Sequence, residues 1–462
     1  MSPPSDGVRV QAGMGGATAL RGAGAWLAWL LALFGFGFDM AAFWPGQMSH
    51  DSALAWWQAR GGAGSDIVPP LFVAVWRACD AVLPGPGLLF ALHSALFWSG
   101  LALLARGLRL RPAATLALLL VTGLAPVTLV LRAHAWTDVG LFSALACATG
   151  LLACVQAGAR RGWLLPAFAL LCYAGGMRHN ALPALLPLLA WLAWLAGRGR
   201  WPAPRIALLA VLLGAGVLGV VRLAALGVEK HVPLWPSLAQ WDLAALSVSS
   251  GTLRLPAFMV GPGLDVPELA RAFRPWANTP MLTGTRHGMR APFDAFSADE
   301  LAQLRAAWIG AIRGDPGGWL AHRWRLSRAL FGTHRREWPA ELIYVDAMVP
   351  YGDNPPLAPN RSALHRAVMR VADAWRATAL LAAWPCLAAG LLLAPRAWRR
   401  RRQPAGCTAL LLLASAWLYA LPLALLAPAA ELRYLGWPCV ASLAAFVIAL
   451  AGGRPARHLA NP

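Results

Sequence analysis

The chain has 462 residues, of which 58% are hydrophobic and only 13% are charged. An ordinary soluble domain carries roughly 25% charged residues, so this composition excludes a typical soluble protein and favours a membrane protein. The net charge of +20 does not indicate nucleic-acid binding, because much of it stands in short clusters between apolar runs, as in the cytoplasmic loops of membrane proteins.

The N-terminal segment, residues 1–25, is rich in Gly, Ala and Pro, and we predict that it is disordered and cytoplasmic. Arg9 and Arg21 precede an apolar run at 26–43. This run exceeds the roughly 7–15 residues of a signal-peptide core, so we expect a retained first span. The seven cysteines form no CxxC pair and mostly lie in or beside apolar runs, which predicts neither a disulfide framework nor a zinc site.

Apolar runs recur along the chain at lengths near the roughly 20 residues that cross a bilayer. We expect an all-α polytopic membrane protein with about ten transmembrane helices, in a module at 24–227 and a second at 376–452. The expected spans are 24–44, 88–105, 114–131, 138–157, 163–177, 181–197, 206–227, 376–395, 407–427 and 434–452.

The arginines of the short connections indicate one orientation. With the N-terminus in the cytoplasm, the cytoplasmic connections are 106–113, 158–162, 198–205, 396–406 and the tail 453–462, and all of them contain Arg and no acid. The opposite short connections contain only Arg132, Arg178 and Arg433. The positive-inside rule therefore predicts both termini in the cytoplasm.

Two longer segments are expected on the outer side. The first, 45–87, contains LAWWQA and LFVAVWRACDAVL, which read as short amphipathic helices. The second, 228–375, reads as a periplasmic cap. Residues 299–328 have a helical pattern that GDPGG interrupts at 314–318, and 341–360 reads as an ordered loop over a site.

Polar residues gather at the outer ends of the expected spans. Because ionisable groups at membrane depth are costly, each indicates function by default. Four connections supply them: Asp51 after the first span, then LRAHAWTD (131–138), GMRHN (176–180) and ELRY (431–434). Topology puts them on one side of the membrane, where carboxylates could act as bases or metal ligands, and Arg and His could hold a phosphate.

Each of these residues also has a plainer interpretation. Asp51 and Asp138 could cap helices, and Asp66 could be a turn residue. Arg178 and His179 could be interfacial anchors, and Arg433 could form a local salt bridge with Glu431. The histidines at 231, 287, 322 and 334 have no ligand spacing, so we predict no metal site from them.

The order of these motifs resembles that of the bacterial GT-C-type membrane glycosyltransferases, whose architecture is related to aminoarabinose transferases and protein O-mannosyltransferases. The resemblance rests on WPGQMSHDS at 44–52, a Trp-Gln-Ala helix, and Asp66 separated by two residues from a Pro pair. Further similar segments are 85–104, TDV at 137–139, GMRHN, 308–326 and ELRYLGWP at 431–438. Two departures are Val68, where relatives often have His, and Thr137, where they commonly have Lys.

The resemblance implies a polyprenyl-phosphate sugar as donor and a glycan, lipid or protein as acceptor. It implies Asp51 as the catalytic base or metal-associated carboxylate and Asp138 as a second acid. The expected phosphate-binding residues are Arg132, His134, Arg178, His179 and Arg433, with support from His50, Asp66, Asn180 and Glu431. No cofactor is predicted with certainty, although a divalent cation could take part. The Ala-, Leu-, Gly- and Arg-rich composition fits a GC-rich bacterial genome, so we expect the inner membrane.

Three other functions stay open on the sequence. A polysaccharide ligase or polymerase also combines many spans with a large outer loop. A transporter or flippase is a second alternative, although the sequence shows no internal repeat of the kind many transporters have. A non-catalytic membrane component is the third, and it would suit the departures at Val68 and Thr137.

Overall fold

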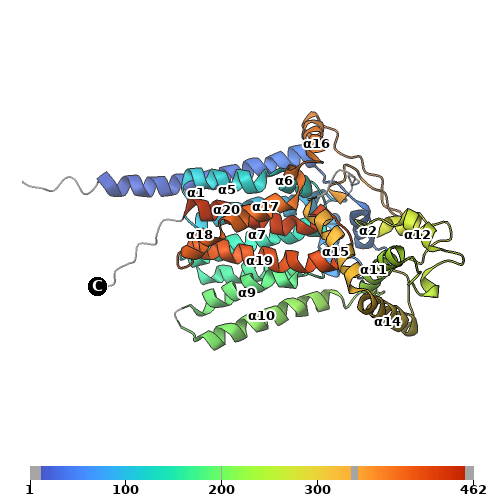
Figure 1. Ribbon diagram of the computed structural model, residues 1–462. Coiled ribbons are helices and arrows are strands. Elements are labelled where there is room, and N and C mark those ends of the chain that lie inside the picture. Colours follow the sequence, from blue (N-terminus) through green and yellow to red (C-terminus); the bar gives the residue numbers. More distant parts are fainter. Residues whose placement is uncertain (1–11, 199, 334–341, 453–462) are drawn as a thin grey trace, which may run out of the picture.

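The structure is a computed structural model that describes residues 12–198, 200–333 and 342–452. In these ranges the chain is helical, with isolated β-bridges but no β-strand. A long bundle of roughly aligned helices carries a smaller group of helices at one end (Figure 1). The bundle is formed by α1 (Ala12–Phe43), α4 (Gly87–Gly107), α5 (Pro112–Gly123), α6 (Pro126–Arg132), α7 (Thr137–Gln156), η1 (Arg161–Trp163), α8 (Leu164–Gly175), α9 (Leu182–Gly197), α10 (Ala203–Ala224), α17 (Ala383–Leu392), α18 (Ala394–Arg399), α19 (Pro404–Leu426), η5 (Leu432–Leu435) and α20 (Gly436–Ala451).

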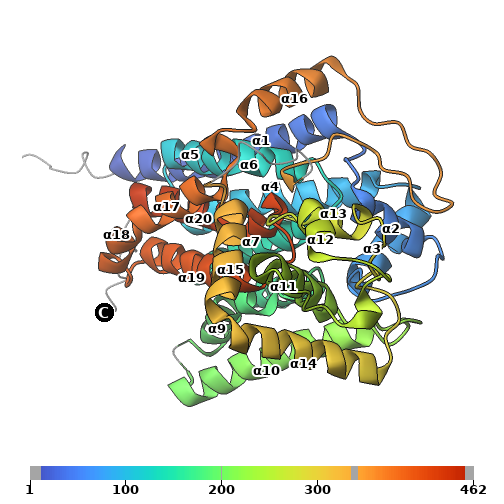
Figure 2. The same ribbon diagram turned by 45° about the vertical axis from the view of Figure 1, so that its right-hand side comes forward.

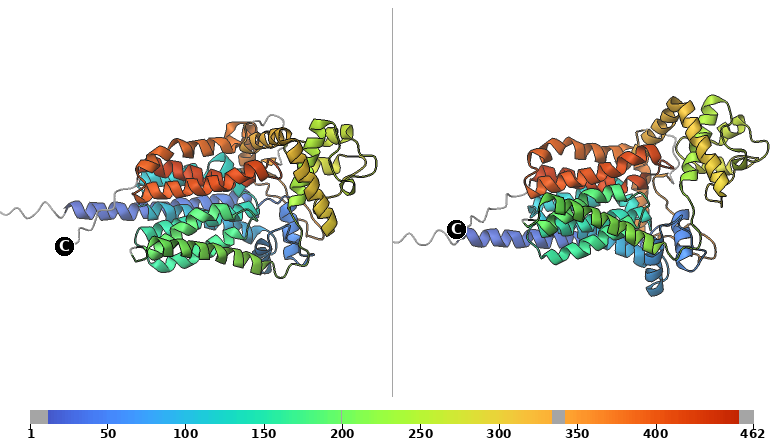
Figure 3. Two further views of the ribbon diagram at one scale, coloured as in Figure 1. Left: turned by 60° about the horizontal axis from the view of Figure 1, so that its bottom comes forward. Right: turned by 90° about the horizontal axis from the view of Figure 1, so that it is seen from below.

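The helices outside the bundle lie at the end where α1 finishes and α7 begins. Figure 3 shows the two helices of the first loop and the second, larger group both at this end. We call residues 228–333 the cap, and Figure 2 shows α15 running between the rest of the cap and the bundle, where it contacts α19. These helices are α2 (His50–Ala59), α3 (Pro70–Val82), α11 (Trp235–Ser250), η2 (Ala257–Met259), α12 (Val266–Ala272), α13 (Thr279–Thr283), α14 (Ala298–Gly314), α15 (Pro316–Phe331), α16 (Ala363–Trp375) and η4 (Ala379–Leu381).

Within the described residues, six helices are long and apolar enough to cross a membrane, or up to seven if the bent pair α5–α6 is one span. The expected count of ten is therefore not established. Three of the expected spans, 163–177, 181–197 and 376–395, contain helices of 12, 16 and 10 residues. These are shorter than the roughly 20 residues of a straight span, because Gly and Pro end them early.

The expected span at 114–131 is broken. Its two halves, α5 and α6, meet at an angle of 60°. Pro126 begins α6, and Ala125 before it has an extended backbone, so the helix cannot continue through this point. The carbonyls that the break leaves free are taken up by side chains: Thr128 donates to Thr122 O at 2.7 Å, and Arg132 Nη2 donates to Gly123 O at 2.7 Å.

The helix α7 is the centre of the bundle. It packs against α4, α8 and α20, and nearly all of its residues are buried. Its backbone approaches α4 closely, because a Cβ on Gly100 would lie 2.5 Å from Cys147 N and one on Gly150 would lie 2.5 Å from Gly100 O. By contrast, α10 lies at the edge and buries only Val217.

The N-terminal helix starts earlier than expected. The sequence predicts disorder for residues 1–25, but α1 begins at Ala12 and continues without a break into the first apolar run. Residues 1–11 and the predicted tail 453–462 lie outside the described ranges.

The predicted helices of the two long segments are confirmed. The first segment forms α2 and α3. In the cap, α14 and α15 meet at Asp315, the position of the predicted GDPGG break, where the Asp315 carboxylate accepts from Gly318 N at 2.8 Å. Ser297 and Glu300 form a capping box that begins α14.

A buried arginine of the cap, Arg323, joins the cap to the bundle. Asp242 of α11 lies 2.5 Å from Arg323 Nη2 of α15 and accepts from the indoles of Trp308 and Trp319. Arg323 Nη1 donates to the carbonyl of Ala427, just after α19 ends, at 3.0 Å. The cap therefore holds a fixed position against the end of α19.

Candidate functional site

A cavity of about 510 Å³ lies between the bundle and the cap. Its polar wall comes from the start of α2, the connection between α8 and α9, and the segment before α20. Its other walls come from the start of α3, from α11, and from the apolar end of α19. Of the eleven site residues predicted from the sequence, six line this cavity: Asp51, Arg178, His179, Asn180, Glu431 and Arg433.

Arg433 is the centre of the polar wall. Its Nη2 lies 2.5 Å from Asp51 Oδ2, and its Nε pairs with Glu431. The guanidinium also lies over the rings of Trp136 and Tyr434, at 5.2 and 5.4 Å from their centroids. The local salt bridge that the sequence suggested thus forms, and Asp51 joins it from the other end of the chain.

The two carboxylates around Arg433 differ in their pKa. Arg433 lowers the pKa of Asp51, whose side chain is 60% exposed to the cavity. Burial raises the pKa of Glu431, which also accepts from the Tyr434 hydroxyl at 3.2 Å. When the environments of two carboxylates push their pKa values apart, the one with the lower pKa suits a base and the one with the higher pKa suits an acid.

Arg178 is held by Asp138. Arg178 Nη1 donates to Asp138 Oδ2 at 2.9 Å, and the guanidinium lies 4.7 Å from the centroid of Tyr434. Burial alone would lower the pKa of Arg178, but Asp138 raises it overall, so this group stays charged. The Asp138 side chain is only 2% exposed and does not line the cavity, so the structure places it as a partner of Arg178, behind the wall.

His179 and Asn180 complete the polar wall beside Arg178. Partial burial, and then the adjacent Arg178, lower the pKa of His179, so the imidazole is neutral near pH 7. A neutral imidazole can accept or donate one proton at this position.

Arg132 does not reach the cavity. Its side chain is buried in the bundle, where it forms an ion pair with Asp39 of α1 and lies over the rings of Phe97 and Trp98. Asp39 also accepts from Ser94 and from the Trp98 indole, at 2.7 and 2.8 Å. The structure therefore replaces the predicted phosphate-binding role of Arg132 with a structural role. This arginine neutralises a buried acid and donates to the Gly123 carbonyl that the α5–α6 break leaves free.

His134 also lies outside the cavity. Its ring is fully buried and stacks on Trp136 at 3.7 Å between centroids. Burial lowers the pKa of His134 to about 4, so the ring is neutral. Nδ1 donates to Val130 O at 2.9 Å, and Nε2 accepts from Val345 N at 3.0 Å, so this histidine holds backbone segments together instead of binding phosphate.

The remaining two predicted residues, His50 and Asp66, lie outside the cavity. His50 packs edge-on against Tyr351 at 5.1 Å and does not line the cavity. Asp66 accepts from Val232 N at 2.6 Å and pairs with His231 at 2.9 Å, so it ties the first loop to the start of the cap. The interpretation of Asp66 as a structural loop residue fits these contacts.

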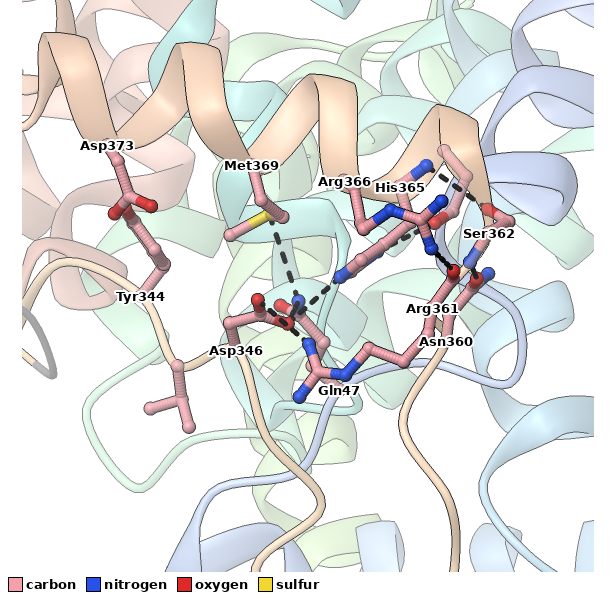
Figure 4. Close-up of polar contacts among 12 residues, drawn as sticks. Gln47, Tyr344, Asp346, Asn360, Arg361, Ser362, His365, Arg366, Met369 and Asp373 are labelled. Atoms are coloured by element: carbon pink, nitrogen blue, oxygen red, sulfur yellow. Dashed lines mark hydrogen bonds and ion pairs between the residues drawn. The ribbon is translucent and has the colours of Figure 1, made fainter.

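The segment that follows the cap supports Asp51 from outside. We call residues 342–362 the strap. Asp346 of the strap accepts from Gln47 Nε2 at 3.0 Å and from His365 Nε2 at 2.9 Å, as Figure 4 shows. The strap backbone also pairs with Met48, which donates to Ala347 O at 2.9 Å and accepts from Val349 N at 3.1 Å. The strap thus fixes the residues that immediately precede α2 and Asp51.

Sequence reasoning missed several of these polar residues. Asp39 could have been found, because it is an acid inside the first apolar run. Asp346, His365, Asp242 and Arg323 gave no such signal, because they lie in the long polar segment among many others. In the described part of the chain, no three His, Cys, Asp or Glu side chains come together in a way that could hold a metal ion.

No protein-family model matches this chain, and neither a curated protein nor a solved structure is significantly similar to it.

Proposed function

We propose that the chain is a GT-C-type membrane glycosyltransferase that moves a sugar from a polyprenyl-phosphate donor to a cell-envelope acceptor. The observation that carries this proposal is the cavity in which the Asp51 carboxylate meets Arg433, with Arg178 in the same wall. A transferase of this kind needs a carboxylate to take a proton and cations to receive a phosphate. The short motifs that resemble the family contribute Asp51, Arg178 and Arg433.

The shape of the cavity suits an amphiphilic donor. Leu423 and Leu426 of α19 line one side of it, and Leu426 is itself exposed on the bundle surface. A polyprenyl chain could lie against this apolar side while its phosphate and sugar enter the polar part. Free sugar nucleotides would leave the apolar side unfilled.

The residues suggest how the transfer would proceed. The acceptor hydroxyl gives its proton to Asp51 as its oxygen attacks the anomeric carbon, and the bond from that carbon to the phosphate oxygen breaks with inversion. The lipid phosphate leaves with the electron pair and is neutralised by Arg178 and Arg433. A phosphate on Arg433 would weaken its hold on Asp51, which raises the pKa of this carboxylate toward the range of a useful base.

The orientation of the chain belongs to the same proposal. Arginines of these connections donate to the last turns of neighbouring helices at the end of the bundle away from the cap: Arg161 to Ala196 O of α9, and Arg396 to Ala449 O of α20. By the positive-inside rule this end is cytoplasmic, so the cap and cavity face the periplasm of a bacterial inner membrane. Cysteine accessibility at positions 262 and 402 to a membrane-impermeant reagent tests this, since only the first should react in intact cells with permeabilised outer membranes.

The test of the function is mass spectrometry of cell-envelope glycolipids and glycans with the gene, without it, and with Asp51→Asn. We expect a glycan species that needs the gene and disappears with Asp51→Asn, although the variant is extracted in normal amounts. Asp66→Asn is the matched control, because Asp66 is an acid of the same loop outside the cavity, and it should keep the product. Full transfer by Asp51→Asn would refute the proposal.

The same experiment separates the alternatives. A ligase or polymerase would add or lengthen whole glycan chains, so the missing species would differ by many sugar units. A transporter is favoured by the buried Asp39–Arg132 pair inside the bundle, since intramembrane charges often mark solute paths. Purified protein in liposomes should then move a solute without any lipid-linked sugar.

A further inference from the structure

A second cavity, of about 500 Å³, lies at the end of the bundle away from the cap. It is formed where α4 and α7 end and where η1 begins, against the middle of α1. None of its lining residues belongs to the candidate functional site. Two arginines, Arg106 and Arg109, and two tryptophans, Trp29 and Trp163, line it together with apolar side chains such as Leu103 and Leu151.

The arginines of this cavity are not neutralised by any carboxylate that the structure describes. Neither Arg106 nor Arg109 forms an ion pair with a carboxylate in the ranges that the structure covers. The neighbouring segments 106–113 and 157–162 contain no acid at all. Arg109 Nη2 donates to Ala157 O at 3.0 Å, which holds it across the gap between α4 and α7 and leaves its charge uncompensated.

The backbone at Arg109 points to a role for its side chain. Its φ is +50°, and in the described part of the chain it is the only non-glycine residue with a positive φ. Arg109 terminates α4 in the left-handed conformation, with Leu110 N donating to Ala105 O at 3.0 Å, at a position where helices usually place glycine. An arginine at this position strains the backbone and does not improve the end of helix α4. Its positive charge is the property that a glycine would lack.

The surroundings are those of a lipid site. Trp29 and Trp163 are partly exposed, and Leu30, Leu33 and Leu165 next to them are strongly exposed on the outside of the bundle. Tryptophans beside exposed leucines are typical of the depth where lipid headgroups meet acyl chains. A soluble phosphate would meet the arginines but would leave these apolar walls uncovered.

We propose that this second cavity binds one anionic phospholipid, with its phosphate on Arg106 and Arg109 and its acyl chains along α1 and η1. The proposal stands on this cavity alone and does not depend on the glycosyltransferase assignment. A zwitterionic phospholipid offers no net charge to the two guanidinium groups, so the site distinguishes lipids by headgroup charge.

The test is native mass spectrometry of the full-length protein released from nanodiscs of equal parts phosphatidylglycerol and phosphatidylcholine. The wild type should retain one phosphatidylglycerol in preference to phosphatidylcholine, and Arg106→Gln/Arg109→Gly should lose this preference roughly tenfold. Glycine suits the backbone at 109, so this variant should unfold at no lower temperature than the wild type. If the double variant nevertheless fails to fold, Arg106→Gln alone decides, because it leaves the strained position unchanged.

The matched control is Arg399→Gln/Arg402→Gln, which removes the same charge from the same end of the bundle but outside the cavity. It should keep the bound phosphatidylglycerol. An equal loss in this control would show only a general attraction between a basic surface and anionic lipid, and would overturn the proposal. Unchanged binding by Arg106→Gln/Arg109→Gly, or displacement of the lipid by millimolar glycerol phosphate, would also overturn it.

Discussion

Asp51 and Arg433 are 382 residues apart in the chain, and their side chains form an ion pair at 2.5 Å in the wall of the main cavity. Asp51 follows the first candidate membrane span, and Arg433 lies at the start of the last one. The pair therefore joins the first and last parts of the bundle at the end that the cap covers. Because Arg433 also holds Glu431, its guanidinium organises both carboxylates of the cavity.

Arg433→Gln tests the importance of this centre. Arg433 lowers the pKa of Asp51, and a lowered carboxyl pKa stabilises the fold at pH values above the unfolded pKa, with the gain lost as pH falls through the folded pKa. The variant should lose this gain at neutral pH. Because solvent screens the 60% exposed Asp51 side chain, the free energy of unfolding should fall by only about 0.2–1 kcal/mol. Transfer activity should fall to background. Thermal unfolding in detergent and the glycan assay measure the two effects, and unchanged values of both would contradict the role.

Glu431→Gln should change how stability depends on pH. Burial raises the pKa of Glu431 above its ordinary value of 4.5, so the folded state binds its proton more tightly than the unfolded state. This makes stability fall as pH rises from about 4.5 through the folded pKa. The variant should remove this component of the slope, as followed by unfolding temperature between pH 4 and pH 8. Glu229→Gln, at an exposed position, is the control and should keep the wild-type slope; an unchanged slope in Glu431→Gln would argue against the raised pKa.

The pair of Asp39 and Arg132 should show strong coupling. Asp39→Asn or Arg132→Met alone leaves a buried charge without its partner, which costs about 3–5 kcal/mol. Asp39→Asn/Arg132→Met removes both charges while an amide oxygen can still accept from Ser94 and Trp98. It should be less damaging than either single change, although Gly123 O still loses its donor. Unfolding in detergent measures all three variants. Strictly additive losses would show that the two residues act separately.

Asp346→Ala should loosen the strap. It removes the acceptor for Gln47 and His365, with an expected loss of about 1–3 kcal/mol in local stability. Limited proteolysis should then cut within residues 342–362 roughly tenfold faster. Transfer should weaken as well, because the strap pairs with the backbone just before Asp51. Asp353→Ala changes an exposed acid of the same strap and should behave as the wild type; equal cleavage of both variants would rule out the Asp346 contacts as the cause.

Much of the helix bundle could be predicted from the sequence. Long apolar runs between arginine-rich connections predict helices such as α4, α7 and α19, since nothing else satisfies the backbone in lipid. The break at Asp315 was also readable, because Pro and Gly there end one helix and start another. The lengths of α8, α9 and α17 were not, because hydropathy does not tell where a helix ends inside an apolar run.

For the candidate site, the sequence predicted only that its residues lie at the same end of the bundle. Topology puts Asp51, Arg178 and Arg433 at one end of the bundle, and they meet in the cavity. The same argument placed Arg132 and His134 with them, but these face inward from the turn between α6 and α7. The rotation of the chain at this turn decides whether a side chain points into the cavity or into the core of the bundle. That rotation depends on contacts with Asp39 and Val345, which are distant in the sequence.

The contact of Arg323 with the carbonyl of Ala427 has a consequence for the cavity as a whole. It fixes the cap to the end of α19, and both of these form walls of the cavity. A molecule that fills the cavity would contact both the cap and α19 and would stabilise their association. Occupancy and resistance to heat are therefore thermodynamically linked in this protein, and a melting-temperature screen of lipid extracts could reveal its natural ligand before any reaction is known.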